Sequence, residues 1–234
     1  MNETKWERYG ASAGIAFVVL LLVSVFIAPM PPHLNASTAK ITSYFSDHRR
    51  ALVTSTLLAS FASLVFLWFV AHLRHVLQRA EGGAEALSPA VFGSGISVAT
   101  VGIISALPTA TLALMAGRPG DPASAATVRM MFDLNFVTQA LLALAAGLFV
   151  VTGSMAMVRK EMVSPNLGWL GILVGALLWI SGSASLYLTT YSRVVDVVGL
   201  VGLLGFALWM LLASGAMYQH PEIERAPSHA PTFA

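Results

Sequence analysis

Between residues 127 and 149 the chain reads TVRMMFDLNFVTQALLALAAGLF, which places one carboxylate, Asp133, beside a long apolar run. From residue 134 to residue 158 the sequence contains no Asp, Glu, Lys or Arg. A helix that crosses a bilayer needs about 20 predominantly apolar residues, so this segment is long enough to span a membrane. Asp133 is then either the last water-facing residue before a span or an acid with a function at the membrane.

The composition of the whole chain favours lipid as its surroundings. Hydrophobic residues make up 56% of the 234 residues and charged residues only 10%, whereas about 25% of a soluble domain is charged. The chain has no cysteine, which excludes disulfides, thiolate metal sites and cysteine nucleophiles. Its net charge of +2 is too small to indicate a nucleic-acid partner.

The charged residues are confined to short windows that separate six long apolar stretches. These stretches cover roughly residues 10–30, 51–72, 91–115, 134–158, 167–188 and 194–217. No alternating pattern of a membrane β-barrel appears, so the stretches are expected to be helices. We predict an all-α polytopic membrane protein with six transmembrane helices arranged as three hairpins. Residues 1–218 form its single domain, and residues 219–234 are expected to be a disordered polar tail.

The connections between the spans indicate an orientation and two helix caps. The tight turn RKEM (159–162) and the basic extension AHLRHVLQRAEGG (71–83) favour the cytoplasmic side, so both termini are expected in the cytoplasm. On the opposite, outer side, prolines end the preceding helix in two connections, and a short Ser/Thr/Ala-rich helix is expected to follow each. Asn35 or Ser37 is expected to cap the first, and Asp121 with Pro122 to start the second.

The acids at the outer connections have two interpretations. Arg129 lies four residues before Asp133, on the same helical face, so a local ion pair is expected. Similar pairs are expected at the other outer turns, Asp47 with Arg50 and Arg193 with Asp196. These pairs are either interfacial staples of small energy, or the three aspartates form an acidic vestibule that binds a cation or a cationic head group.

Within the predicted spans the polar residues are uncharged. Asn135 and Gln139 are four residues apart on one helical face, where they are expected to hydrogen-bond either a ligand or a neighbouring helix. Pro108 is expected to kink its helix and is a candidate hinge. Glycines repeat at Gly171–Gly175 and every third residue from 199 to 205, a spacing typical of close helix packing in lipid.

No pattern in the sequence assigns catalytic chemistry. His72 and His75 have a spacing that suits two ligands of one metal, but Arg74 and Arg79 beside them repel a cation. No nucleophile triad, metalloprotease motif or phosphate loop appears. We therefore assign no catalytic residue, no metal site and no cofactor, and enzymatic activity is not expected.

Four segments resemble a known group of proteins: ITSYFSDHRRAL (41–52), FLWFVAHLRHVLQRAEGG (66–83), NLGWLGILVGALL (166–178) and FALWMLLASGAMY (206–218). The order of these segments is similar to that in uncharacterised six-helix membrane proteins of actinobacteria, the class of domain of unknown function 4386. The resemblance implies a multi-pass protein of a bacterial inner membrane and carries no catalytic residues.

Two functions remain open from the sequence. The first is a non-enzymatic bundle that binds a lipophilic small molecule or a membrane-protein partner, because its spans hold small and neutral polar residues. The alternative is a small-molecule transporter, with the outer aspartates as its vestibule and Pro108 as its hinge.

Overall fold

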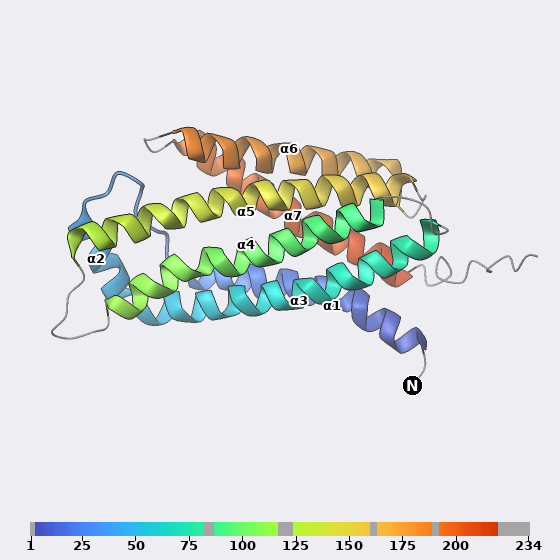
Figure 1. Cartoon of the computed structure of the whole chain (residues 1–234), viewed down its shortest axis with the longest axis horizontal. Helices are drawn as coiled ribbons and strands as arrows, with labels where there is room; N and C mark the ends of the chain where they lie inside the picture. The colour runs from blue at the N-terminus through green and yellow to red at the C-terminus, as the bar shows by residue number, and fades with distance from the viewer. Residues whose placement is uncertain (1–2, 82–86, 117–123, 160–162, 189–191, 220–234) are drawn as a thin grey trace, which may run out of the picture.

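The computed structural model describes residues 3–81, 87–116, 124–159, 163–188 and 192–219, and within them it contains helices and no strand. The helices are α1 (Glu3–Ile27), α2 (Thr38–Asp47), α3 (Arg49–Glu81), α4 (Leu87–Met115), α5 (Ala125–Arg159), α6 (Pro165–Tyr187) and α7 (Arg193–Gln219). The six long helices, α1 and α3 to α7, run alternately up and down one bundle, and the short α2 lies at one end (Figure 1). We call this end the α2 end.

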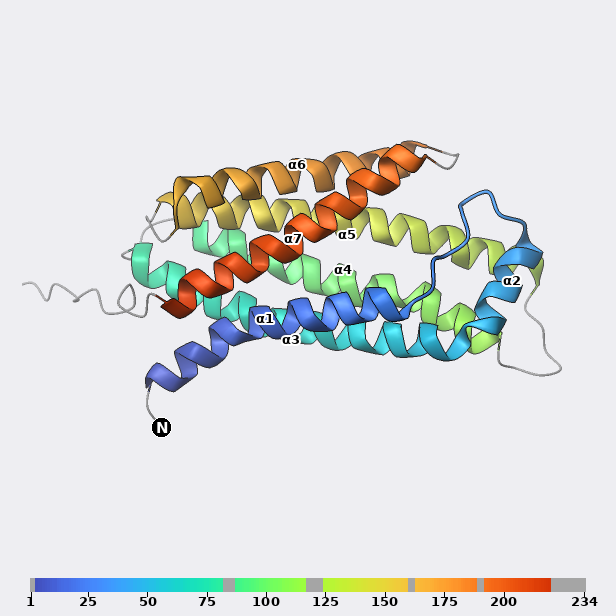
Figure 2. The same cartoon turned by 180° about the vertical axis from the view of Figure 1, so that it is seen from behind.

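The long helices form a closed ring. Each one packs against the next along the chain, from α1 through α3, α4, α5 and α6 to α7, and α7 returns to contact α1. The view from behind shows α1 and α7 nearest to each other toward the end opposite α2 and diverging toward the α2 end (Figure 2). The ring is therefore tightly closed in one half and wider in the other.

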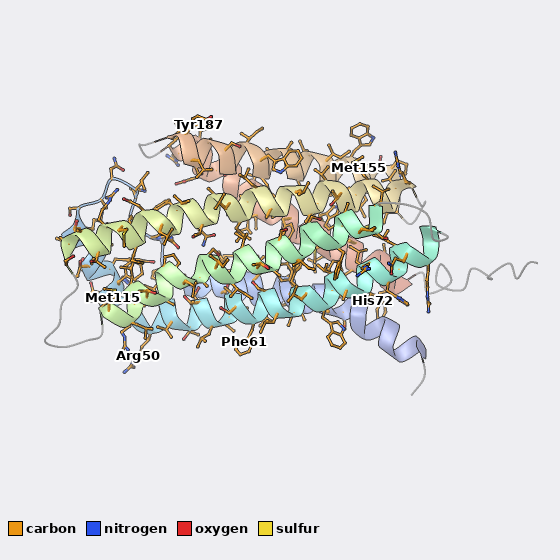
Figure 3. All side chains as sticks on the ribbon, in the orientation of Figure 1. Arg50, Phe61, His72, Met115, Met155 and Tyr187 are labelled. Atoms are coloured by element: carbon orange, nitrogen blue, oxygen red, sulfur yellow. The ribbon has the colours of Figure 1, made fainter. Side chains whose placement is uncertain are left out.

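Length and composition allow most of these helices to cross a membrane. Five of them, α3 to α7, are long and apolar enough, and the apolar segment Ser12–Ile27 of α1 is shorter. Large apolar side chains cover the outward faces of the bundle; Phe61 and Tyr187, for example, point away from it (Figure 3). Such a surface suits lipid and not water. Five helices of this length and composition are compatible with a multi-pass membrane protein, and the sixth span, α1, stays a prediction.

The predicted short helix in the first outer connection is confirmed as α2. Its N-cap is Ser37, whose hydroxyl accepts a hydrogen bond from the backbone N–H of Lys40 at 3.4 Å. Ile41 and Phe45 are buried, whereas most of the other α2 side chains are exposed, so the helix lies on the bundle with one apolar face down. This face packs into a small apolar cluster with side chains of α3, α4 and α5.

The second predicted cap, at Asp121 and Pro122, lies outside the described residues. Helix α5 begins at Ala125. Ser124 stands before its first residue and accepts a hydrogen bond from the backbone N–H of Thr127 at 3.1 Å. At the other end of the chain, α7 includes Gln219, the first residue of the predicted tail 219–234, and the rest of that tail lies outside the described residues.

Aromatic side chains fill the half of the bundle opposite the α2 end. Phe66, Phe149 and Trp209 are fully buried, and their rings meet edge to face, with centroids 5.1 Å apart for Phe66–Phe149 and 5.8 Å for Phe149–Trp209. This geometry is the one that aromatic pairs prefer. These rings form an aromatic core in that half.

Glycines bring the neighbouring helices close together, as predicted. The three glycines of α7 all face α6: a Cβ added to Gly199, Gly202 or Gly205 would lie 2.7, 3.0 and 2.7 Å from side-chain atoms of Ser181, Leu178 and Val174, respectively. In α6, Gly175 faces Gly147 of α5. The glycine repeats therefore serve contacts within this chain, where their lack of a side chain lets helix backbones approach.

Candidate ligand-binding cavity

A cavity of about 770 Å³ occupies the wider half of the bundle, next to the α2 end. All seven helices contribute to its wall. This volume lies within the range of roughly 300–1,000 Å³ that is usual for small-molecule sites. The size and position of this space make it the candidate functional site.

Aromatic residues close the cavity at both ends. Its floor is formed by Phe17, Phe66 and Phe206, whose ring centroids lie 4.8 to 6.5 Å apart and which adjoin the aromatic core through Phe149. Its roof is α2, through Tyr44 and Phe45. The cavity therefore runs along the bundle axis, from the α2 end down to the aromatic core.

Tyr44 ties the roof to the wall. Its hydroxyl donates a hydrogen bond of 2.7 Å to the carbonyl oxygen of Pro29, which follows α1. Burial raises the pKa of Tyr44 to about 12, because the charged phenolate is poorly solvated there. The phenol is therefore neutral and acts as a hydrogen-bond donor at ordinary pH. Sequence analysis did not single out Tyr44, although Ile41, Tyr44 and Phe45 share the spacing of an amphipathic helix.

The predicted pair Asn135 and Gln139 does line the cavity, one helical turn apart on α5. The side-chain oxygen of Asn135 accepts a hydrogen bond from the hydroxyl of Thr109 on α4 at 3.0 Å. Asn135 thus joins two helices, one of the two roles expected for it. Gln139 makes no hydrogen bond within the part of the chain that the structure describes, and its side chain is exposed.

Hydroxyl groups supply most of the remaining polar lining, and nearly all of them already donate to the protein. Ser55 donates to the carbonyl of Ser24 on α1 at 2.8 Å. Thr56, Ser63, Ser105 and Ser185 donate to carbonyls within their own helices. Ser181 is the exception, because its side chain lines the cavity, is 8% exposed and donates to no described residue. No pattern in the sequence distinguishes Ser181 from the other serines.

None of the described residues that line the cavity is an Asp, Glu, Lys, Arg or His. Asp133 lies near the α2 end of α5, outside the lining, with its side chain 45% exposed. Its predicted ion pair is confirmed: Arg129 Nε donates to Oδ2 at 3.0 Å, and Arg129 Nη2 lies 2.9 Å from Oδ1. Arg129 also donates to the carbonyl of Ala36 at 3.2 Å, so the pair staples α5 to the segment before α2. Asp133 is thus a paired, half-exposed residue.

The other two predicted ion pairs do not form within the part of the chain that the structure describes. Asp47 and Arg50 belong to two different helices, α2 and α3, which the single residue His48 separates, so the spacing rule for one helix does not apply. Arg193 and Asp196 both lie in the first turn of α7 but are exposed and not joined, since water screens such pairs. Asp47 and Asp196 also lie outside the lining of the cavity.

Pro108 lies inside α4, buried, and the helix continues past it to Met115. Because proline has no backbone N–H, it leaves the carbonyl of Ile104 without its usual partner in the helix. The next residue, Thr109, carries the bond to Asn135. The hinge role of Pro108 stays a prediction.

Comparison of the chain with protein-family models, with curated proteins and with solved structures finds no match. The resemblance to the class of domain of unknown function 4386 therefore stays a prediction. Within the described ranges, no group of three or more His, Cys, Asp or Glu side chains is placed to hold a metal ion. The cavity is therefore the structural feature from which we infer a function.

Proposed function

We propose that this protein is a non-enzymatic, multi-pass membrane protein that binds an uncharged lipophilic molecule inside its helix bundle. The observation that carries the proposal is the cavity of about 770 Å³, whose described lining is apolar or neutral and polar. Small-molecule sites are mostly apolar, with a few polar groups that fix the orientation of the ligand. In this proposal α1 is the sixth span and α2 lies at the membrane surface.

The chemistry of the lining supports binding over acid–base catalysis. General acid–base work needs a positioned group that titrates near the working pH. The described lining offers hydroxyls and two amides, and the Tyr44 phenol has its pKa moved further from neutrality. These groups can hold a ligand by hydrogen bonds.

The positions of the three aspartates do not support the alternative of a transporter with an acidic vestibule. Asp133 is paired with Arg129, and none of Asp47, Asp133 and Asp196 lines the cavity. A cation held by these acids would therefore not lie in the space that the bundle encloses. Loss of substrate flux on replacing all three acids by Asn is the result that would restore this alternative.

We propose further that the protein lies in a bacterial inner membrane with both termini in the cytoplasm. The even number of proposed spans places the two termini on one side. A green fluorescent protein fused after Ala234 should then fluoresce, whereas alkaline phosphatase fused there should be inactive. Active phosphatase at that position would reverse the orientation.

Binding inside the cavity can be tested by filling the cavity with a larger side chain. Ala59 on α3 is half-buried and lines the cavity, whereas Ala71 on the same helix is exposed and lies outside the lining. Phenylalanine at position 59 places a ring in the cavity, and phenylalanine at position 71 places the same ring outside it. Native mass spectrometry of each purified protein, with lipid extraction of the same samples, measures what is bound.

We expect a stoichiometric lipophile on the wild-type protein and on Ala71→Phe, and less than a tenth of that amount on Ala59→Phe. Far-ultraviolet circular dichroism should show the same helix content in all three proteins. A wild-type protein without any bound lipophile, or equal amounts on both variants, would refute binding in the cavity.

A further inference from the structure

We propose that the ligand is an uncharged amphiphile with one hydrogen-bonding head and one hydrocarbon chain, held parallel to the bundle axis with its head toward α2. This inference rests on the proposed function and names the class of ligand and its orientation. It follows from how polarity, free hydrogen-bond donors and charge are distributed along the cavity.

Polarity changes along the cavity axis. The polar lining residues gather in the half nearer α2, and the opposite half is almost entirely apolar. The polar set is Ser24, Ser55, Thr56, Ser105, Thr109, Asn135, Gln139, Ser181 and Ser185. The apolar half includes Ala62, Val98, Ala146 and the floor of Phe17, Phe66 and Phe206, with Ser63 as its one hydroxyl, and that hydroxyl already donates to Ala59. A ligand that matches this lining is polar at one end only.

Three side chains in the polar half have hydrogen-bond donors that bind no other described residue. The amide nitrogen of Asn135 remains free because only its oxygen is engaged, by Thr109. Gln139 and Ser181 donate to no residue in the described part of the chain. Ser181 is a buried residue that lines the cavity, so its hydroxyl can donate to a ligand oxygen there. A hydroxyl or carbonyl oxygen is the head group that these donors recognise.

The lack of charge in the described lining excludes an ionised head. A carboxylate, phosphate or ammonium at this depth would have no counter-charge, and burying an unpaired ion is far more costly than burying a neutral hydroxyl. The Arg129–Asp133 ion pair lies outside the lining, and its two charges are already paired with each other. Fatty acids, phospholipids and quaternary amines are therefore poor ligands, and neutral lipids with a hydroxyl or carbonyl are good ones.

The length of the cavity fits a chain that reaches the middle of a bilayer. Asn135 and Ala146 both line it and lie eleven residues apart on α5, which is about 16 Å at 1.5 Å per residue. Half of a hydrocarbon core about 30 Å thick is nearly the same distance. The bound molecule would thus lie as it does in one leaflet, with its chain ending at the aromatic floor.

The molecule reaches this position from the side. Helices α1 and α7 diverge toward the α2 end (Figure 2), and both line the cavity there. On the α1 side the lining includes Val25, Phe26 and Met30, whose exposed fractions are 40%, 79% and 87%. The cavity thus comes to the surface among apolar side chains, so a lipid-dissolved molecule enters without crossing water.

Competition photolabelling in nanodiscs tests this inference. The probe is a twelve-carbon alcohol with a diazirine at the end of its chain. Its competitors are 1-dodecanol, dodecane, dodecanoate and dodecyltrimethylammonium. The protein is tested as wild type, Gln139→Leu, the exposed-face control Thr100→Leu, and the cavity-filling variant Ala59→Phe. Gln139→Leu removes a side chain that has no intramolecular bond, so folding should be unaffected.

We expect the probe to label peptides that contain Phe17, Phe66 or Phe206, and dodecanol to compete at least tenfold better than each other competitor. Gln139→Leu should remove most of this preference for dodecanol over dodecane, and Thr100→Leu should keep it. Labelling that persists in Ala59→Phe would overturn the proposed function itself. Labelling that Ala59→Phe abolishes, with dodecane or a charged competitor equal to dodecanol, would overturn only the amphiphile assignment.

Discussion

Replacing Gly175 by alanine should destabilise the bundle, because this glycine lies where α5 and α6 touch through their backbones. A Cβ at Gly175 would lie 3.0 Å from the carbonyl oxygen of Gly147 and still closer to the side chain of Val151. A backbone carbonyl cannot rotate away, and a β-branched valine has few alternative rotamers. The two helices would therefore have to separate.

Two opposing contributions set the change in the free energy of unfolding caused by Gly175→Ala. Overpacking a close contact costs about 1–3 kcal/mol, whereas replacing glycine by alanine inside a helix stabilises it by up to about 1 kcal/mol. The variant Gly93→Ala on α4 measures only the gain in helix stability, because a Cβ there would meet nothing within 4 Å. Gly175→Ala should thus be less stable than Gly93→Ala by about 1–3 kcal/mol.

Unfolding in mixed micelles by titration with sodium dodecyl sulfate, followed by tryptophan fluorescence, measures this difference. Gly93→Ala should unfold at the wild-type detergent fraction or above it, and Gly175→Ala below it. Equal midpoints for the two variants would refute the argument, because the close approach of α5 and α6 would then not contribute to stability.

Three further predictions concern the polar contacts around the cavity. Because the pKa of Tyr44 rises from 10.0 to about 12 on folding, the neutral phenol should contribute fully to the free energy of unfolding below pH 10, and this contribution should be lost between pH 10 and 12. Hydrogen exchange of α2 should show this loss in the wild type and not in Tyr44→Phe. Thr109→Val and Asn135→Leu should couple by about 0.6 kcal/mol in a double-mutant cycle, and additive effects would mean that their hydrogen bond contributes nothing. Arg129→Met should lower the free energy of unfolding by under about 1 kcal/mol, because its ion pair with Asp133 is half-exposed; a loss of several kcal/mol would show a buried role.

Local patterns in the sequence were sufficient for the helices and for the contacts between near neighbours. Helix α2, the ion pair of Arg129 with Asp133 and the packing of the repeated glycines all follow from spacing within one helix or from capping chemistry. The same reasoning failed for Asp47 and Arg50, because a helix ends between them. Spacing predicts a contact only where both residues share one helix.

The sequence by itself determined an all-helical, apolar chain, because hydrophobic length and the positions of charges are local properties that need no neighbour in space. Only the tertiary structure decided which uncharged polar residues act together. Asn135 meets Thr109 across 26 residues of sequence, and Ser181 shares a cavity wall with Gln139 because α5 and α6 pack side by side. A cavity is a property of how helices pack, since its volume depends on the angles at which α1 and α7 diverge and on where aromatic side chains fill the remaining space.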